Sequence, residues 1–249
     1  MNEGKDIPVI LKEHEEFLLS TYKPCNEIIF KAQSTKPWES KLGGCPYLED
    51  LKDYPLDEKG RPMMFLAQIN FEEMPHLPDF PSKGLLQFYI VDDDCYGSDG
   101  GCYVRYLQQY HRDEYGFITE NPYQKNYQGY EPFERSGKMQ FSNREMPVGT
   151  ECGKFIEHFP YNIVPEEQWN ALYDLCYASG SRIGGYPHFT QIAPAYYDDG
   201  VCDVMLLQLD IEDECGIMFG DTGNCTFLIA KEELRNLDFS KVEYNWQCC

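Results

Sequence analysis

Two glutamines, Gln68 and Gln208, are the polar residues whose positions most invite a chemical role. Each lies inside an apolar run, at residues 66–70 and 206–210, and such runs are typical of buried strands. A buried amide needs partners for its hydrogen-bonding groups. The sequence therefore supports two interpretations. Both amides bond to backbone groups in the core, which is the commoner case, or both point into a cleft and bind a ligand there.

A second candidate is the segment 220–224, which reads Gly-Asp-Thr-Gly-Asn. Its glycines could let the backbone cradle an anion, with Asp221 as a base beside it and Asn224 as a further ligand-binding residue. The same composition is typical of a hairpin turn, and no long helix follows as in a phosphate-binding loop. The candidate ligand-binding residues are thus Gln68, Gln208, Asp221 and Asn224.

Other constellations fail on spacing. Asp92, Asp93, Asp94 and Asp99 suggest a calcium loop, but the twelfth position counted from Asp92 is a tyrosine and not a glutamate. The sequence contains no Gly-x-Ser-x-Gly elbow and no Cys-x-x-Cys pair. His188 is a lone histidine in a loop, and such residues are usually exposed. We therefore predict no catalytic set, no metal site and no cofactor.

These residues belong to two copies of one pattern. Gly43-Gly44 recurs as Gly184-Gly185, and the matches around the two glutamines and the two later strands follow at offsets of 141, 140, 140 and 138 residues. This spacing predicts an internal duplication, with repeats at about 40–110 and 181–249. Both repeats are apolar on two faces, so we expect them to share one core in a single compact domain of residues 1–249.

The fold class that these patterns predict is α+β, with mainly antiparallel sheets, few helices, and two intertwined halves related by a pseudo-twofold axis. Helices are predicted near residues 8–22, 165–178 and 231–236. Strands are predicted at 27–32, 63–70, 84–91, 103–110, 204–211, 216–219, 224–230 and 242–246. Residues 111–160 have no counterpart. They read as a polar excursion with short strands such as 138–142, which carries function or covers a sheet edge.

Composition restricts the partners. The formal net charge of −21 repels phosphate backbones and anionic lipids, so we expect no nucleic-acid or membrane binding and favour a basic protein partner. Eleven cysteines without paired spacing, and no leader or apolar span of about 20 residues, indicate a reduced, cytoplasmic protein.

The combined pattern resembles the bacterial YwqG-like family, a domain family of unknown function. The resemblance runs from about residue 40 to the end and is carried by segments 41–47, 65–71, 80–90, 93–97, 182–186, 206–210, 220–224 and 238–249. It implies an intracellular α+β protein with an internal duplication, and it supplies no site residues. Some relatives are thought to be encoded near toxin systems, which raises the idea of an immunity protein.

The leading functional hypothesis is a cytoplasmic binding protein, and not an enzyme, that neutralises a basic partner such as a toxin domain. The alternative is an enzyme or small-ligand binder whose site lies in the groove between the repeats, lined by Gln68, Gln208 and the Asp221 turn.

Overall fold

A computed structural model of the 249-residue chain describes residues 5–98, 101–113, 115–198 and 200–249. These residues form ten strands in one antiparallel sheet and five α-helices, so the prediction of a mainly antiparallel fold with few helices is confirmed. The strands are β1 (Lys23–Lys31), β2 (Lys41–Leu42), β3 (Met64–Asn70), β4 (Leu85–Ile90), β5 (Cys102–Leu107), β6 (Gly137–Met146), β7 (Arg182–Gly184), β8 (Val204–Leu209), β9 (Asn224–Ile229) and β10 (Glu243–Gln247). The α-helices are α1 (Glu15–Ser20), α2 (Gly153–His158), α3 (Glu166–Cys176), α4 (Ala195–Asp198) and α5 (Lys231–Arg235).

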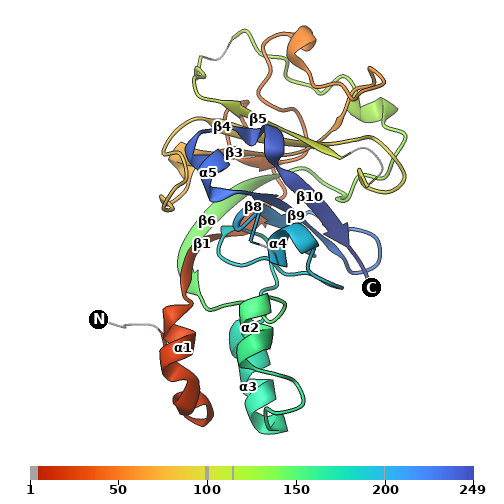
Figure 1. The fold of residues 1–249 in the computed structure, drawn as a ribbon. Helices are drawn as coiled ribbons and strands as arrows, with labels where there is room; N and C mark the ends of the chain where they lie inside the picture. The colour runs from red at the N-terminus through yellow and green to blue at the C-terminus, as the bar shows by residue number, and fades with distance from the viewer. Residues whose placement is uncertain (1–4, 99–100, 114, 199) are drawn as a thin grey trace.

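The sheet runs in the order β10-β9-β8-β7-β1-β6-β2-β3-β4-β5 and curls into a nearly closed, barrel-like shape (Figure 1). Side chains of β10 reach the loop that precedes β5 at the opposite edge. The Tyr244 hydroxyl donates to the Tyr96 carbonyl at 2.7 Å, and Trp246 Nε1 donates to Ser98 Oγ at 2.5 Å. The curl brings the two outer strands near one another, which protects edges that would otherwise be open to pairing with another chain.

The strand order is symmetric about the centre of the sheet when each strand from β1 to β5 is matched with the strand numbered five higher. β2 to β5 follow one another outward on one side, and β7 to β10 do so on the other, with β1 and β6 between them. The register shifts at matching places, between Phe65 and Ala67 in β3 and between Met205 and Leu207 in β8. We call residues 40–110 the first half and residues 181–249 the second half.

The centre of the sheet holds the largest departure from the sequence prediction. β6 has ten residues, twice the length of the predicted strand at 138–142, and it pairs with β1 on one side and with β2 on the other. It therefore does not cover a sheet edge. Its sequence, Gly-Lys-Met-Gln-Phe-Ser-Asn-Arg-Glu-Met, has few of the β-branched and aromatic residues that mark strands, because one face of β6 is largely exposed.

The turn after β8 also differs from expectation. The predicted strand at 216–219 is absent, and isolated bridges join Glu212 to Ile217 and Phe219 to Gly223. Gly216 and Gly220 have φ values of +67° and +59°, and these left-handed residues bend the chain too sharply for a strand.

The main core lies inside the curled sheet and takes side chains from both halves. β3, β4 and β9 are buried along their whole length, as their continuous apolar runs predict. Phe88 of β4 and Phe227 of β9 meet edge to face with ring centroids 4.9 Å apart. Burial of apolar area is worth about 25 cal/mol per Å², so this shared interior ties the halves together.

A second core lies among the helices. α1, α2 and α3 gather at one end of the molecule, beyond the ends of β1 and β6 (Figure 1). They bury Leu18, Phe155 and Leu172 together with Met146, at the end of β6. α3 begins after Pro165, with Glu166 and Glu167 in its first turn, and ends one residue before Tyr177. The chain then passes directly into β7.

Candidate functional site

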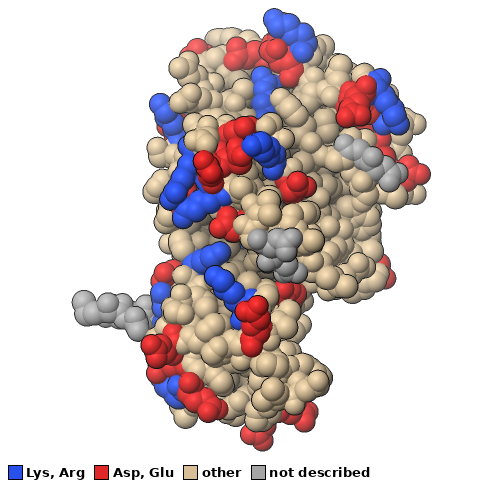
Figure 2. Space-filling model, in the orientation of Figure 1, with Lys and Arg blue, Asp and Glu red and all other residues tan. Residues whose placement is uncertain are grey.

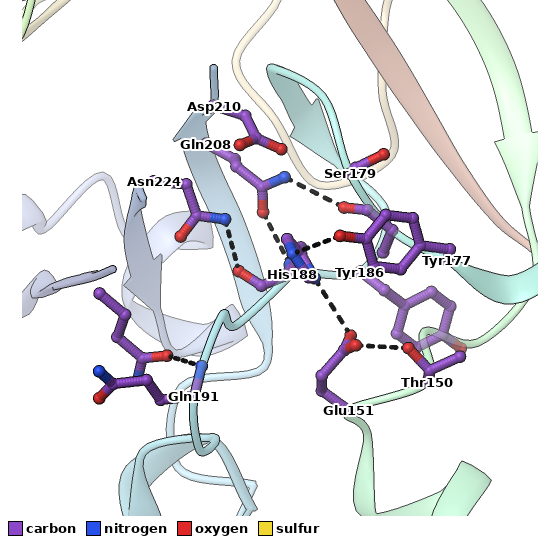
Figure 3. Close-up of polar contacts among 12 residues, drawn as sticks. Thr150, Glu151, Tyr177, Ser179, Tyr186, His188, Gln191, Gln208, Asp210 and Asn224 are labelled. Atoms are coloured by element: carbon purple, nitrogen blue, oxygen red, sulfur yellow. Dashed lines mark hydrogen bonds and ion pairs between the residues drawn. The ribbon is translucent and has the colours of Figure 1, made fainter. Parts of the chain in front are cut away.

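Gln208, on β8, is completely buried, and its amide fixes the loop that follows β7. Its Oε1 accepts the His188 N–H at 2.8 Å, and its Nε2 donates to the carbonyls of Ala178 at 3.1 Å and Gly180 at 2.8 Å (Figure 3). All of these partners are backbone groups, as expected for a core glutamine that supports the fold.

Gln68, on β3, makes the same bonds in the first half. Its Oε1 accepts the Tyr47 N–H at 2.8 Å, and its Nε2 donates to the carbonyls of Pro37 and Glu39 at 2.8 and 2.9 Å. The two amides share no hydrogen-bond partner, since Gln68 binds Tyr47, Pro37, Glu39 and Gln87 whereas Gln208 binds His188, Ala178 and Gly180.

Asn224 joins Gln208 in holding His188, because its Nδ2 donates to the His188 carbonyl at 3.0 Å (Figure 3). Asp221 is exposed at the tip of the turn, where its carbonyl accepts the Cys249 N–H at 3.1 Å. Of the four predicted residues, Gln208 and Asn224 therefore converge on the backbone of His188, and Asp221 lies apart from them.

His188 is the centre of the most developed polar cluster. We expected a lone loop histidine to be exposed, but only 6 % of His188 is exposed. Gln208 and Asn224 bind its backbone and hold the loop against the sheet. Nε2 lies 3.2 Å from the Tyr177 hydroxyl, and Nδ1 lies 3.5 Å from Oε2 of Glu151 (Figure 3). The other oxygen of Glu151 accepts the Thr150 hydroxyl.

A cavity of about 650 Å³ opens beside this cluster. Its lining comes entirely from residues after position 150: Glu151, Tyr173, Tyr177, Ser179, Gly180, His188, Phe189, Thr190, Gln191, Asp210, Ile211, Thr222 and Cys249. Three of its buried polar atoms, Glu151 Oε2, His188 Nδ1 and Thr190 Oγ1, have no hydrogen-bond partner among the described residues. Two of them, Glu151 Oε2 and His188 Nδ1, face one another at 3.5 Å. We call this cavity the His188 pocket.

The His188 pocket is negatively charged. Glu151 and Asp210 line it, and its described lining contains neither lysine nor arginine. Arg182 is fully buried and donates to the carbonyls of Ala178 and Gly180, so one guanidinium near the pocket stands against two carboxylates in its lining. Asp210 accepts the Gly180 N–H at 2.6 Å.

Tyr177 supplies a hydroxyl that remains protonated at neutral pH. Burial, a hydrogen bond with Tyr173 and the nearby carboxylates raise the pKa of Tyr177 to about 12. The rings of Tyr173 and Tyr177 stack with centroids 4.6 Å apart, and both rings are partly exposed. The pocket thus combines carboxylates with aromatic surface, a combination that suits cations.

The remaining candidates do not form a site. The Asp92 carboxylate accepts the N–H groups of Gln128 and Gly129, and Oδ1 of Asp93 accepts those of Cys95 and Gly97, so these carboxylates brace loops. Asp99 lies outside the described residues. Across residues 5–98, 101–113, 115–198 and 200–249, no cluster of three or more metal-binding side chains occurs.

Sequence reasoning missed Glu151, Tyr177 and Asp210. They lie after β6, after α3 and after β8, and only the fold brings them together. The sequence held one indirect signal: His188 follows the second Gly-Gly turn, and a buried Gln208 needs backbone partners such as the His188 N–H.

The chain belongs to the family of a domain of unknown function, DUF1963, whose model matches residues 40–248. The resemblance to the YwqG-like family is consistent with this family. No curated protein matches the chain. None of the helices that the structure describes combines the length and apolarity needed to cross a membrane.

Proposed function

We propose that this protein is a binding protein whose His188 pocket accepts a cationic group, the ammonium or guanidinium group of a basic partner. The observation that carries the proposal is the lining of the pocket, in which Glu151 and Asp210 face a polar cavity beside two tyrosine rings. The Glu151 side chain is 20 % exposed and its Oε2 is buried against His188 Nδ1, so a cation in the pocket would approach Oε1.

The energetics favour a cation. A charge-assisted hydrogen bond to Glu151 is worth about 1.5–3 kcal/mol, and a cation over the face of Tyr173 or Tyr177 gains about 0.5–2 kcal/mol. The net charge of −21 attracts basic molecules over a longer range and accelerates their association. On the face drawn in Figure 2, acidic and basic side chains are interspersed.

The partner in this proposal is a basic protein, met in the cytoplasm, and neutralisation of a basic toxin domain is one concrete form of it. A small amine offers the same cationic chemistry as a lysine side chain. The two sources differ in the contacts that they make outside the pocket.

An enzymatic role is the second candidate. Tyr177, His188 and Glu151 form a hydroxyl–imidazole–carboxylate series, the arrangement by which a base activates a nucleophile. Two features favour binding over catalysis. The pKa of about 12 makes Tyr177 a poor nucleophile at neutral pH, and 3.5 Å is long for the hydrogen bond that would orient His188.

We also infer that the chain arose by duplication of one unit, that the two copies are β1–β5 and β6–β10 and include the first and second halves, and that residues 1–249 fold as a single compact domain. The palindromic strand order and the paired register shifts support this. So do the paired cations: Lys41 donates to the carbonyls of Pro37 and Cys45, and Arg182 donates to those of Ala178 and Tyr186. An experimental structure in which β1–β5 and β6–β10 follow different paths would contradict the inference.

The proposed function is tested with N-acetyl-arginine amide and N-acetyl-lysine amide, titrated into the full chain and followed by NMR. We expect saturable binding that weakens with added salt and falls about tenfold in Glu151→Gln, since one charge-assisted hydrogen bond is lost. Asp221→Asn removes an exposed carboxylate outside the pocket and is the matched control. Absence of saturable binding, or equal loss in both variants, would contradict the proposal.

A further inference from the structure

The first half contains a counterpart of the His188 pocket, and the chain itself fills it. Tyr47 takes the place of His188: Gln68 accepts its N–H at 2.8 Å, and Gln87 donates to its carbonyl at 2.9 Å. Gln208 and Asn224 hold the two backbone groups of His188, although Thr226 and not Asn224 stands opposite Gln208 as Gln87 stands opposite Gln68. The positions that line the pocket in one half can therefore be compared with those in the other.

The residues that follow β5 cover the first-half position. The Tyr47 ring lies 6.1 Å from the Tyr110 ring, 6.0 Å from His111 and 5.1 Å from Phe117, measured between centroids. The Ile118 N–H donates to the Leu48 carbonyl at 2.9 Å.

The covering residues also place polar groups in a set order. The Tyr110 hydroxyl accepts from Asn70 Nδ2 at 3.0 Å, His111 Nε2 lies 3.6 Å from Glu49, and Arg112 Nη2 lies 3.2 Å from Glu72. An aromatic residue is thus followed, two positions later, by a guanidinium group paired with a carboxylate.

The second half has counterparts of Asn70 and Glu72, the residues that contact Tyr110 and Arg112, and both counterparts are acidic. At the offset of 140 residues, Asp210 replaces Asn70, and Glu212 stands at the place of Glu72. Phe189 takes the place of Leu48 at the offset of 141. No described segment seals this position, and the cavity of about 650 Å³ falls within the range of about 300–1,000 Å³ typical of ligand pockets.

We propose that the His188 pocket binds an extended peptide segment of a partner protein, with an aromatic residue followed two positions later by a basic one. Tyr110, Arg112 and Ile118 contact the first half in this way. The inference rests on the proposed function and names its ligand. In the bound state the aromatic ring packs on His188 and Tyr177 beside Asp210, the counterpart of Asn70. The cation pairs with Glu212, the counterpart of Glu72, and a peptide N–H donates to the Phe189 carbonyl.

The probe is a synthetic peptide with the sequence of residues 109–119, capped at both ends and labelled for fluorescence anisotropy with the full chain. We expect it to bind more tightly than N-acetyl-arginine amide, and its dissociation constant to rise about tenfold with Glu212→Gln, which removes the carboxylate that pairs with the cation. Asp210→Asn should leave the dissociation constant near the wild-type value. Asp210→Asn installs the residue that the first half uses at this place, so it should fold normally. A peptide carrying Asp113→Asn should bind more tightly, because the pocket is acidic. A peptide carrying Arg112→Ala should bind more weakly.

The outcomes separate the two proposals. If the amide binds but the peptide binds no more tightly, the peptide inference fails and the proposed function stands. If neither probe binds, both fail. NMR shifts locate the bound peptide: perturbation at His188, Phe189 and Asp210 supports the inference. Perturbation confined to Tyr47 and Leu48 would mean that the peptide displaces the native segment of the first half, and would overturn it.

Discussion

Replacing Gln208 by methionine tests whether this amide both supports the fold and positions His188. Gln208→Met preserves the approximate shape of the side chain and deletes its three hydrogen bonds. The carbonyls of Ala178 and Gly180 keep a partner, because Arg182 Nη2 also donates to them at 2.6 and 3.1 Å. The His188 N–H loses Gln208 Oε1 and has no other hydrogen-bond acceptor among the described residues.

The expected cost follows from that difference. One orphaned buried donor costs about 1–3 kcal/mol, and the two shared carbonyls each lose a bond of about 0.5–1 kcal/mol. We therefore expect Gln208→Met to lower the free energy of unfolding by about 3 kcal/mol, a large part of the roughly 5–15 kcal/mol of a typical domain. Gln68→Met is the matched control, since it orphans the Tyr47 N–H and leaves the His188 pocket untouched.

The assay is urea unfolding at 25 °C followed by circular dichroism and tryptophan fluorescence, with coincident transitions as the test of two-state behaviour. Gln68→Met should lose at least as much stability, because it also removes the bond from Gln87 Nε2. Only Gln208→Met should weaken binding of N-acetyl-arginine amide, by about tenfold for a loss of about 1.4 kcal/mol. A loss of less than about 1 kcal/mol in both variants, or equal effects on binding, would refute the reasoning.

Three further predictions concern the scaffold. An added Cβ at Gly185 (φ +71°) would lie 2.6 Å from Met146 Sδ, whereas an added Cβ at Gly60 (φ +74°) would have nothing within 4 Å. Gly60→Ala should therefore lower the free energy of unfolding by about 1–2 kcal/mol, and Gly185→Ala by at least about 1 kcal/mol more. Urea unfolding measures both, and equal losses would refute the contact. Burial lowers the pKa of Lys41 from 10.5 to about 8, so between these pH values the unfolded chain holds a proton that the folded chain releases. The free energy of unfolding, compared with that of Lys41→Met, should therefore rise with pH by up to about 3 kcal/mol across this window. A difference between the two proteins that does not change with pH would contradict this. Phe88→Leu and Phe227→Leu should show a coupling energy of about 0.5–1.5 kcal/mol in a double-mutant cycle, and additive losses would argue against a shared core.

The sequence predicted the scaffold well where apolar pattern decides the structure. Residues 63–70 and 84–91 read as buried strands, and β3 and β4 lie within those limits. It predicted only the first half of β6, at 138–142, because the mostly polar residues of β6 form a strand through partners that β1 and β2 offer on both sides. Local pattern carries no record of such neighbours.

The site was less predictable. The buried glutamines were found, because an amide in an apolar run is conspicuous. Their role as supports for Tyr47 and His188 depends on loops that approach from elsewhere in the chain. Glu151 and Tyr177 have unremarkable surroundings in the sequence, and only tertiary packing places them 3.5 and 3.2 Å from His188.

The most direct test of the account is the dissociation constant of N-acetyl-arginine amide for the wild type, Glu151→Gln and Asp221→Asn, measured at low salt. A cation-accepting His188 pocket predicts saturable binding that is about tenfold weaker in Glu151→Gln and unchanged in Asp221→Asn. Equal affinities in all three proteins would mean that the pocket does not recognise cations.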